Sequence, residues 1–126
     1  MKSFWQDKTG SFGVMAAFVI PVLGVAIGGG IGLGASGNIN PDGTFPSMFE
    51  PVHGSAPDIA GQGIANPVGQ IWSAAMMLDH LGETEAAAAI VAAIETVLAQ
   101  APLRTRDLGG RANTVECGKA IADAIG

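Results

Sequence analysis

Glu50–Asn66, with the sequence EPVHGSAPDIAGQGIAN, gathers turn-forming residues, a histidine and acidic side chains into one polar segment between apolar stretches. Four polar side chains follow one another along it: His53, Ser55, Asp58 and Asn66. The carboxylate of Asp58 could accept hydrogen bonds from two neighbouring hydroxyls, as on a ribose. This composition is typical of a loop that binds a ligand.

The same segment contains both glycines, which widen the range of backbone conformations, and prolines, which restrict it. Gly54, Gly61 and Gly63 can adopt positive φ and let a ligand approach the main chain, while Pro51 and Pro57 restrict it. An ordinary long surface loop would have a similar composition, so the residues alone leave both interpretations open.

The loop and its flanks read GGIGLGASGNINPDGTFPSMFEPVHGSAPDIAGQGIANPVGQIWSAAMMLDHLG. This run closely resembles the signature of the β-decarboxylating dehydrogenases, the isopropylmalate, isocitrate and tartrate dehydrogenase family, and looks most like the tartrate branch. The resemblance covers about Gly29–Ile125, including RTRDLGG at Arg104–Gly110 and the ending GKAIADAI. It implies an α/β fold class: a partial isopropylmalate-dehydrogenase-like fold at 29–126, with a short strand, an NAD loop and three helices.

The resemblance also implies a cofactor and the residues that bind it. In this family the loop binds NAD, and the residues that match those around the adenosine half are His53, Gly54, Ser55, Ala56, Asp58, Ile59 and Asn66. Glu50 matches a residue near the nicotinamide side, and Asp107 lies in a segment near the adenine site. The family oxidises a 2-hydroxy acid with the help of Mg²⁺ or Mn²⁺.

The length, charge and cysteine count of the sequence exclude several kinds of binding partner and cross-link. The 126 residues amount to one domain at most, with 48% hydrophobic residues and a net charge of −5. The six Lys and Arg residues form no basic stripe, so nucleic acid is not an expected partner. The single cysteine, Cys117, allows no internal disulfide and is expected to be a small core residue.

Residues 1–28 look like a separate apolar segment, unrelated to the family. Phe12–Leu33 contains 22 residues without a charge, long enough to span a bilayer, and lysines precede it. One interpretation is a membrane anchor or uncleaved signal, and SFGVMAAFVIPVLG loosely resembles the start of Tad-type pilus assembly proteins. The alternatives are a buried strand and helix or a poorly ordered gene-fusion remnant. We expect a cytoplasmic protein, with membrane anchoring as the alternative.

Between the glycines and the loop, turn residues dominate. Gly32–Gly37 fits G-x-G-x-x-G, but SGNINPDGTFP follows instead of a helix, so a dinucleotide fingerprint is not expected here. Asn40–Gly43 predicts a β-turn with proline in its second position, and Ser47–Val52 predicts a short strand ending near Pro51.

Three helices are expected after the loop. The first starts with Asn66 as N-cap and Pro67 at the first helical position, and ends at Leu81 before Gly82. The second covers about Glu83–Gln100. The third runs from Asn113 or Thr114 to Ile125, with Glu116 as a capping-box partner. Their apolar stripes at helical spacing are Val68, Ile71, Trp72, Ala75 and Met76; Ile90, Val91, Ile94, Val97 and Leu98; and Ile121 and Ile125.

The family's reaction needs a tyrosine, a lysine, substrate-binding arginines and metal-binding aspartates, which all precede the region matched here. This sequence has no tyrosine and no lysine between Lys8 and Lys119. We therefore expect no catalytic residue and no metal ligand in it, and a C-terminal fragment that is inactive alone. Its partners would be NAD and either the missing dehydrogenase portion or a second copy. A binding-only remnant and a membrane-anchored protein are the alternatives.

Overall fold

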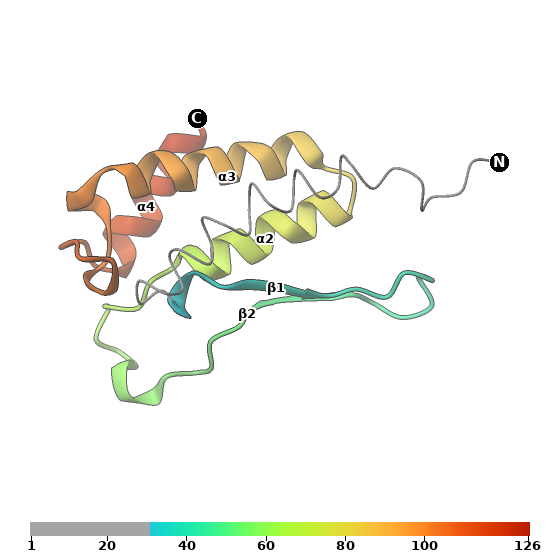
Figure 1. The fold of residues 1–126 in the computed structure, drawn as a ribbon, viewed down its shortest axis with the longest axis horizontal. Coiled ribbons are helices and arrows are strands. Elements are labelled where there is room, and N and C mark those ends of the chain that lie inside the picture. The colour runs from blue at the N-terminus through green and yellow to red at the C-terminus, as the bar shows by residue number, and fades with distance from the viewer. Residues whose placement is uncertain (1–30) are drawn as a thin grey trace.

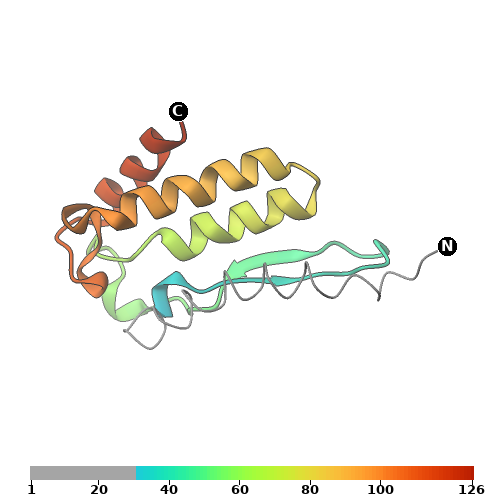
Figure 2. The ribbon, with the colours of Figure 1, turned by 45° about the horizontal axis from the view of Figure 1, so that its top comes forward.

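The computed structural model describes residues 31–126, which form two strands, three α-helices and four short 3-10 turns. The elements in chain order are η1 (Ile31–Leu33), β1 (Ala35–Asn38), β2 (Met48–Pro51), η2 (Pro57–Ile59), α2 (Val68–His80), α3 (Thr84–Ala99), η3 (Ala101–Leu103), η4 (Arg106–Leu108) and α4 (Thr114–Ile125). Figure 1 shows α2 between the hairpin of β1 and β2 on one side and α3 on the other. Figure 2 shows the same order of layers from a second direction.

The small sheet is an antiparallel hairpin in which Ala35 pairs with Pro51 and Asn38 with Met48. Only its second strand was expected from the sequence. Ala35–Asn38 (ASGN) has little strand propensity of its own, and pairing with β2 makes it extended. The predicted β-turn is confirmed, since the amide of Gly43 donates to the Asn40 carbonyl at 3.2 Å. Because β1 follows η1, the G-x-G-x-x-G sequence opens a strand and not a helix.

The three expected helices are all present, and their ends follow the predicted signals. At the end of α2, Gly82 has φ 90° and its amide donates to Asp79, while Glu83 donates to Leu78, which is the Schellman arrangement. The capping box of Asn113 and Glu116 opens α4. The start of α2 differs by one residue from the prediction, because Pro67 is the N-cap and Asn66 precedes it.

The hydrophobic core lies where α2, α3 and α4 meet. Its buried members are Leu33, Val68, Ala93, Ile94, Val97, Ala112, Cys117 and Ile121. One expectation for an apolar side chain was wrong, since Ile125, predicted on the apolar face of the third helix, is 44% exposed. Ile125 is the last residue of α4, one turn beyond the buried Ile121.

The expected N-terminal segment, residues 1–28, and most of the possible membrane span at 12–33 lie outside the described residues. The last residues of the uncharged run, Ile31–Leu33, form η1, and Leu33 is buried in the same core cluster as Val68. Within residues 31–126, no helix is both long enough and apolar enough to cross a bilayer.

Gly69 sets how closely α2 approaches the strands. A Cβ at this position would lie 2.7 Å from the Gly32 carbonyl oxygen and 3.3 Å from the Pro51 Cβ. Such contacts force a backbone shift, because the nearest atom belongs to the main chain and cannot turn aside. The glycine therefore holds the helix against the segment that leads into the loop.

We expect Gly69→Ala to lower the free energy of unfolding by about 1–3 kcal/mol, although alanine is the better helix former. Gly118→Ala is the matched control, since Gly118 is also inside a helix and, among residues 31–126, its Cβ would meet only Pro67 Cγ at 3.9 Å. The control should gain up to about 1 kcal/mol. Thermal unfolding followed by circular dichroism measures both, and equal shifts in the two variants would contradict the packing argument.

Candidate functional site

The loop expected to bind a ligand connects β2 to α2, at the opposite end of the molecule from the hairpin turn (Figure 1). Glu50 lies on β2, Asp58 and Ile59 lie on η2, and Asn66 stands just before α2. The remaining expected residues, His53, Gly54, Ser55 and Ala56, form the irregular stretch between β2 and η2. All are exposed except Ile59 and Asn66, which are half-buried, so a ligand can reach the whole loop.

The loop carries a strained residue at its centre. Ala56 has φ 42° and ψ 61°, a left-handed conformation that costs a residue with a Cβ about 1–2 kcal/mol. Ala56 immediately precedes Pro57. The amide of Ile59 donates to the Ala56 carbonyl at 3.1 Å, and this hydrogen bond closes η2. Strain of this kind tends to concentrate at ligand clamps.

The glycines of the loop behave differently from one another. Gly61 and Gly63 have φ 77° and 66°, so the positive φ predicted for them is confirmed. Gly54 does not have positive φ, and a Cβ at Gly54 would meet no atom of residues 31–126 within 4 Å. The space beside Gly54 is therefore open to a ligand.

Several hydrogen-bonding groups of the loop are unused. Within the described residues, the main-chain amides of positions 53–56 and 58 donate to no protein acceptor, and the Asp58 carboxylate accepts no hydrogen bond. His53 is engaged only locally, through Nδ1 and the Gly54 carbonyl at 3.0 Å. Amide donors beside a carboxylate acceptor fit a ligand that has both anionic oxygens and hydroxyl groups.

The far end of the loop is tied to α4. Thr114 donates from its amide to the Gly63 carbonyl at 2.9 Å and from its hydroxyl to the Ala65 carbonyl at 2.5 Å. One residue at the start of α4 therefore fixes two carbonyl groups of the loop. No sequence signal indicated this contact, which joins positions 49 apart.

Both the oxygen and the nitrogen of the Asn66 side-chain amide form hydrogen bonds. Its Oδ1 accepts from the Val68 amide at 3.0 Å, and its Nδ2 donates to Asp107 Oδ2 at 2.9 Å. The first bond satisfies a free amide at the start of α2, as a capping residue would. The second brings the RTRDLGG segment, which the sequence only placed near the site, into direct contact with the loop.

The RTRDLGG segment is shaped by its own backbone. The Gly110 amide donates to the Thr105 carbonyl, and the Ala112 amide donates to the Arg104 carbonyl, each at 3.0 Å. A Cβ on Gly110 would overlap the backbone of Arg104, so only glycine fits. Thr105 is fully buried, and its hydroxyl has no hydrogen-bond partner in the described part.

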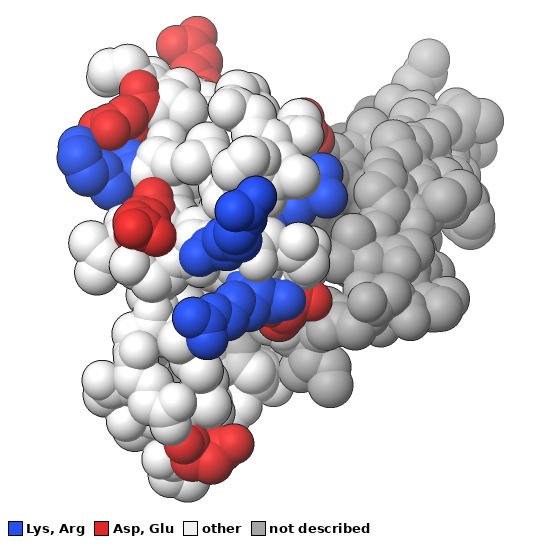
Figure 3. Space-filling model, turned by 90° about the vertical axis from the view of Figure 1, so that its left-hand side faces the viewer, with Lys and Arg blue, Asp and Glu red and all other residues white. Residues whose placement is uncertain are grey.

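The two arginines of this segment differ in exposure, and Arg104 is the half-buried one. Its Nε donates to the Leu98 carbonyl at 2.6 Å, which satisfies a carbonyl left free at the end of α3. Arg106 and Arg111 are exposed. All lysines and arginines of the described part lie within 104–119, and Figure 3 shows them on the end of the molecule that it faces. Asp107, Glu116 and Asp123 belong to the same stretch, and Asp123 pairs with Lys119, so this end of the molecule carries mixed charge.

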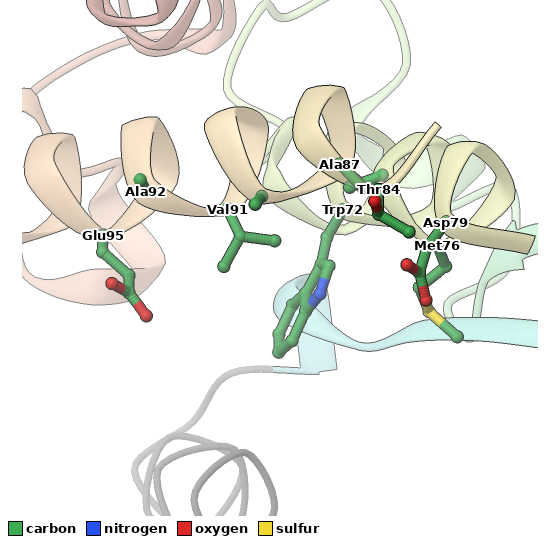
Figure 4. A pocket seen from close by; sticks show the side chains of 10 residues that line it. Trp72, Met76, Asp79, Thr84, Ala87, Val91, Ala92 and Glu95 are labelled. Carbon is green, nitrogen blue, oxygen red and sulfur yellow. The ribbon is translucent and has the colours of Figure 1, made fainter. Parts of the chain in front are cut away.

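A groove lies away from the loop, between α2 and α3. This groove of about 490 Å³ is lined mainly by small and apolar side chains, with Asp79, Thr84 and Glu95 at its edges. Figure 4 shows Trp72 from α2 and Val91 from α3 directed to its open side. The groove contains none of the site residues expected from the sequence.

Cys117 and the acidic residues offer little further chemistry. Cys117 is fully buried, as expected of a core residue, and burial raises the pKa of its thiol, with the Asp107 carboxylate adding to the shift. Among residues 31–126, no three histidine, cysteine or acidic side chains are grouped so that they could hold a metal ion.

Comparison with known proteins shows the family to which the chain belongs. The family model for isocitrate/isopropylmalate dehydrogenase matches residues 23–125, and the chain belongs to this family. The match begins before Gly29, inside the uncharged run. That residues 1–28 are unrelated to the family therefore stays a prediction.

Individual relatives agree with the tartrate and isopropylmalate branches. The chain is 48% identical over 130 residues to a probable tartrate dehydrogenase/decarboxylase of Bacillus subtilis (strain 168), covering 99% of this chain and 36% of the relative. It is 54% identical over 107 residues to a 3-isopropylmalate dehydrogenase of Thermobifida fusca (strain YX), covering 85% and 29%. The chain thus spans about a third of the length of these relatives.

Solved structures support the fold. Isocitrate dehydrogenase from Methylococcus capsulatus superposes with a TM-score of 0.72 at 43% identity, over 77% of this chain and 28% of that one. A β-decarboxylating dehydrogenase from Thermococcus kodakarensis gives a TM-score of 0.71 at 44% identity, over 85% and 30%. The expected partial α/β fold of this family is therefore confirmed.

Proposed function

We propose that this chain forms the NAD-binding portion of an NAD-dependent oxidoreductase that acts on the CH–OH group of a 2-hydroxy acid, of the tartrate or isopropylmalate type. The observation that carries the proposal is the loop between β2 and α2, in a chain of this family. It is exposed and strained at Ala56, and it presents unused amide donors beside a free carboxylate.

Each group in the loop has a chemical role in this proposal. The unused amides at 53–56 donate to oxygens of the dinucleotide, and Asp58 accepts from the ribose hydroxyls of the adenosine half. Ile59, half-buried, offers the adenosine an apolar contact, and Asn66 binds it from the start of α2. Glu50, exposed on β2, lies toward the nicotinamide side, as its match in the family implies. Bound NAD would supply the hydride acceptor.

We assign no catalytic residue and no metal ligand within this sequence. Its inherited activity requires a tyrosine, a lysine and acidic metal ligands from another part of the dehydrogenase, where Mg²⁺ or Mn²⁺ would bind. The alternative is a remnant that binds the nucleotide without catalysis. The two differ in whether hydride transfer appears once that other part is supplied.

The partner beyond NAD would be either the missing dehydrogenase portion or a second copy of this chain. Support comes from the open apolar groove between α2 and α3 and from large exposed side chains such as Phe45 and Val115. An open apolar groove is the kind of surface that favours association. We also propose a cytoplasmic location, and recovery of the chain in a salt-washed membrane fraction would contradict it.

We expect NAD to bind the 126-residue chain, as measured by isothermal titration calorimetry. Gly54→Trp should abolish the binding without changing the melting temperature, because the Cβ of residue 54 points into open space that the cofactor would fill. Thr44→Trp is the matched control, an equally large side chain at an exposed position in the hairpin turn. If the control weakens NAD binding as much as Gly54→Trp does, the cofactor does not bind at the loop.

A further inference from the structure

Asn66 and Asp107 form a link between segments that are 41 positions apart. The bond joins the start of α2 to η4, and Gly32 of η1 lies against both side chains. A Cβ at Gly32 would come 3.3 Å from Asn66 Cβ and 3.4 Å from Asp107 Oδ2. Three separate segments therefore converge on one amide group.

The two hydrogen bonds fix which way the amide points. Its oxygen faces the Val68 amide and its nitrogen faces the Asp107 carboxylate. A half-turn of the amide would put N–H against N–H and oxygen against carboxylate, and both contacts are repulsive. One N–H of the amide remains, and Asn66 is half-buried rather than enclosed, so this N–H can reach a ligand.

We propose that Asp107 is a positioning residue that holds the Asn66 amide so that it offers the bound nucleotide a hydrogen-bond donor. This inference rests on the proposed NAD binding. The group recognised would be an acceptor of the adenosine half, either a ring nitrogen of the base or an oxygen of the ribose. Asp107 itself need not touch the cofactor, and its effect passes through Asn66.

The test is a double-mutant cycle on NAD affinity, measured by calorimetry with the full chain. Asp107→Ala should weaken NAD binding about tenfold. Without the carboxylate, the Asn66 amide spends only part of the time in the orientation that offers its N–H to the nucleotide. Asp107→Asn keeps an acceptor oxygen and should stay within about threefold of the unaltered chain. In an Asn66→Ala background, Asp107→Ala should have no further effect.

A purely structural role would not give this pattern. Asp123→Ala removes the same charge from an exposed ion pair on α4 and serves as the control, with no expected change in affinity. The inference is overturned if Asp107→Ala weakens binding equally with and without Asn66, or if it has no effect in the unaltered background.

A second measurement keeps the inference separate from the proposed function. In NMR spectra, the Asn66 side-chain amide protons should show a nuclear Overhauser contact to Gly32 that Asp107→Ala abolishes. Absence of that contact in the unaltered chain overturns the geometry. If the contact is present but no variant binds NAD, then the proposed function has failed, and with it the ligand role of Asn66, while the Asp107 positioning contact stands.

Discussion

With NAD and Mg²⁺ or Mn²⁺ supplied, the 126-residue chain is expected to form no NADH from tartrate, malate or isopropylmalate. Hydride transfer requires the substrate to be held about 3–3.5 Å from the nicotinamide, and such positioning is worth roughly 7–11 kcal/mol of barrier. The sequence has no tyrosine, and its only lysines are Lys2, Lys8 and Lys119, outside any matched catalytic motif. General acid–base catalysis, worth about 10²–10⁴-fold, would therefore also be missing.

The measurement is NADH absorbance over hours with purified chain. Glu50 and His53 are the two loop residues that could act as a general base in place of the family's catalytic residues. A variant combining Glu50→Gln with His53→Ala is therefore the control. Steady NADH formation that this control abolishes would show that the chain is itself a catalyst. Turnover that appears only when the upstream dehydrogenase polypeptide is added would support complementation, and its loss with Gly54→Trp would place the contribution at the loop.

NADP is expected to bind at least about tenfold more weakly than NAD. The Asp58 carboxylate can accept hydrogen bonds from free ribose hydroxyls, but it repels a 2′-phosphate. Two like charges about 4 Å apart repel by roughly 1 kcal/mol in water and by roughly 4 kcal/mol at an effective dielectric constant of about 20. Asp58 is exposed, so the lower part of that range applies and added salt should narrow the preference.

Asp58→Asn should bring the two affinities within about threefold, since the amide removes the charge and keeps an acceptor. Asp42→Asn, an equal charge change in the exposed hairpin turn, should leave the preference unchanged. Calorimetric titration of each variant with both dinucleotides measures the ratio. Equal affinities in the unaltered chain, or a ratio that Asp58→Asn does not move, would mean that another group selects the cofactor.

The helices could be predicted from the sequence because their signals are local. Apolar spacing, the capping pair of Asn113 and Glu116, and the glycine after α2 each act within a few residues. The β-turn at Asn40–Gly43 was predicted for the same reason. For the loop, the order of glycines and polar groups indicated a binding segment, and its resemblance to a family supplied the ligand.

What the sequence could not predict depends on contacts between distant segments. Strand β1 forms through pairing with β2, and Arg104 is drawn from solvent by the free carbonyl groups of α3. The Asn66–Asp107 bond and the Thr114 contacts join positions 41 and 49 apart. Ala56 carries a conformation that its residue type disfavours, so no local propensity could reveal it.

The most direct test of the NAD-binding role is a titration of the ¹⁵N-labelled chain with NAD, followed by amide chemical shifts. We expect the largest changes at the unused amides of residues 53–56 and 58, and at the side-chain amide of Asn66, with small changes in α3. Changes confined to the groove between α2 and α3 around Trp72 and Val91, or no saturable change at all, would contradict the account.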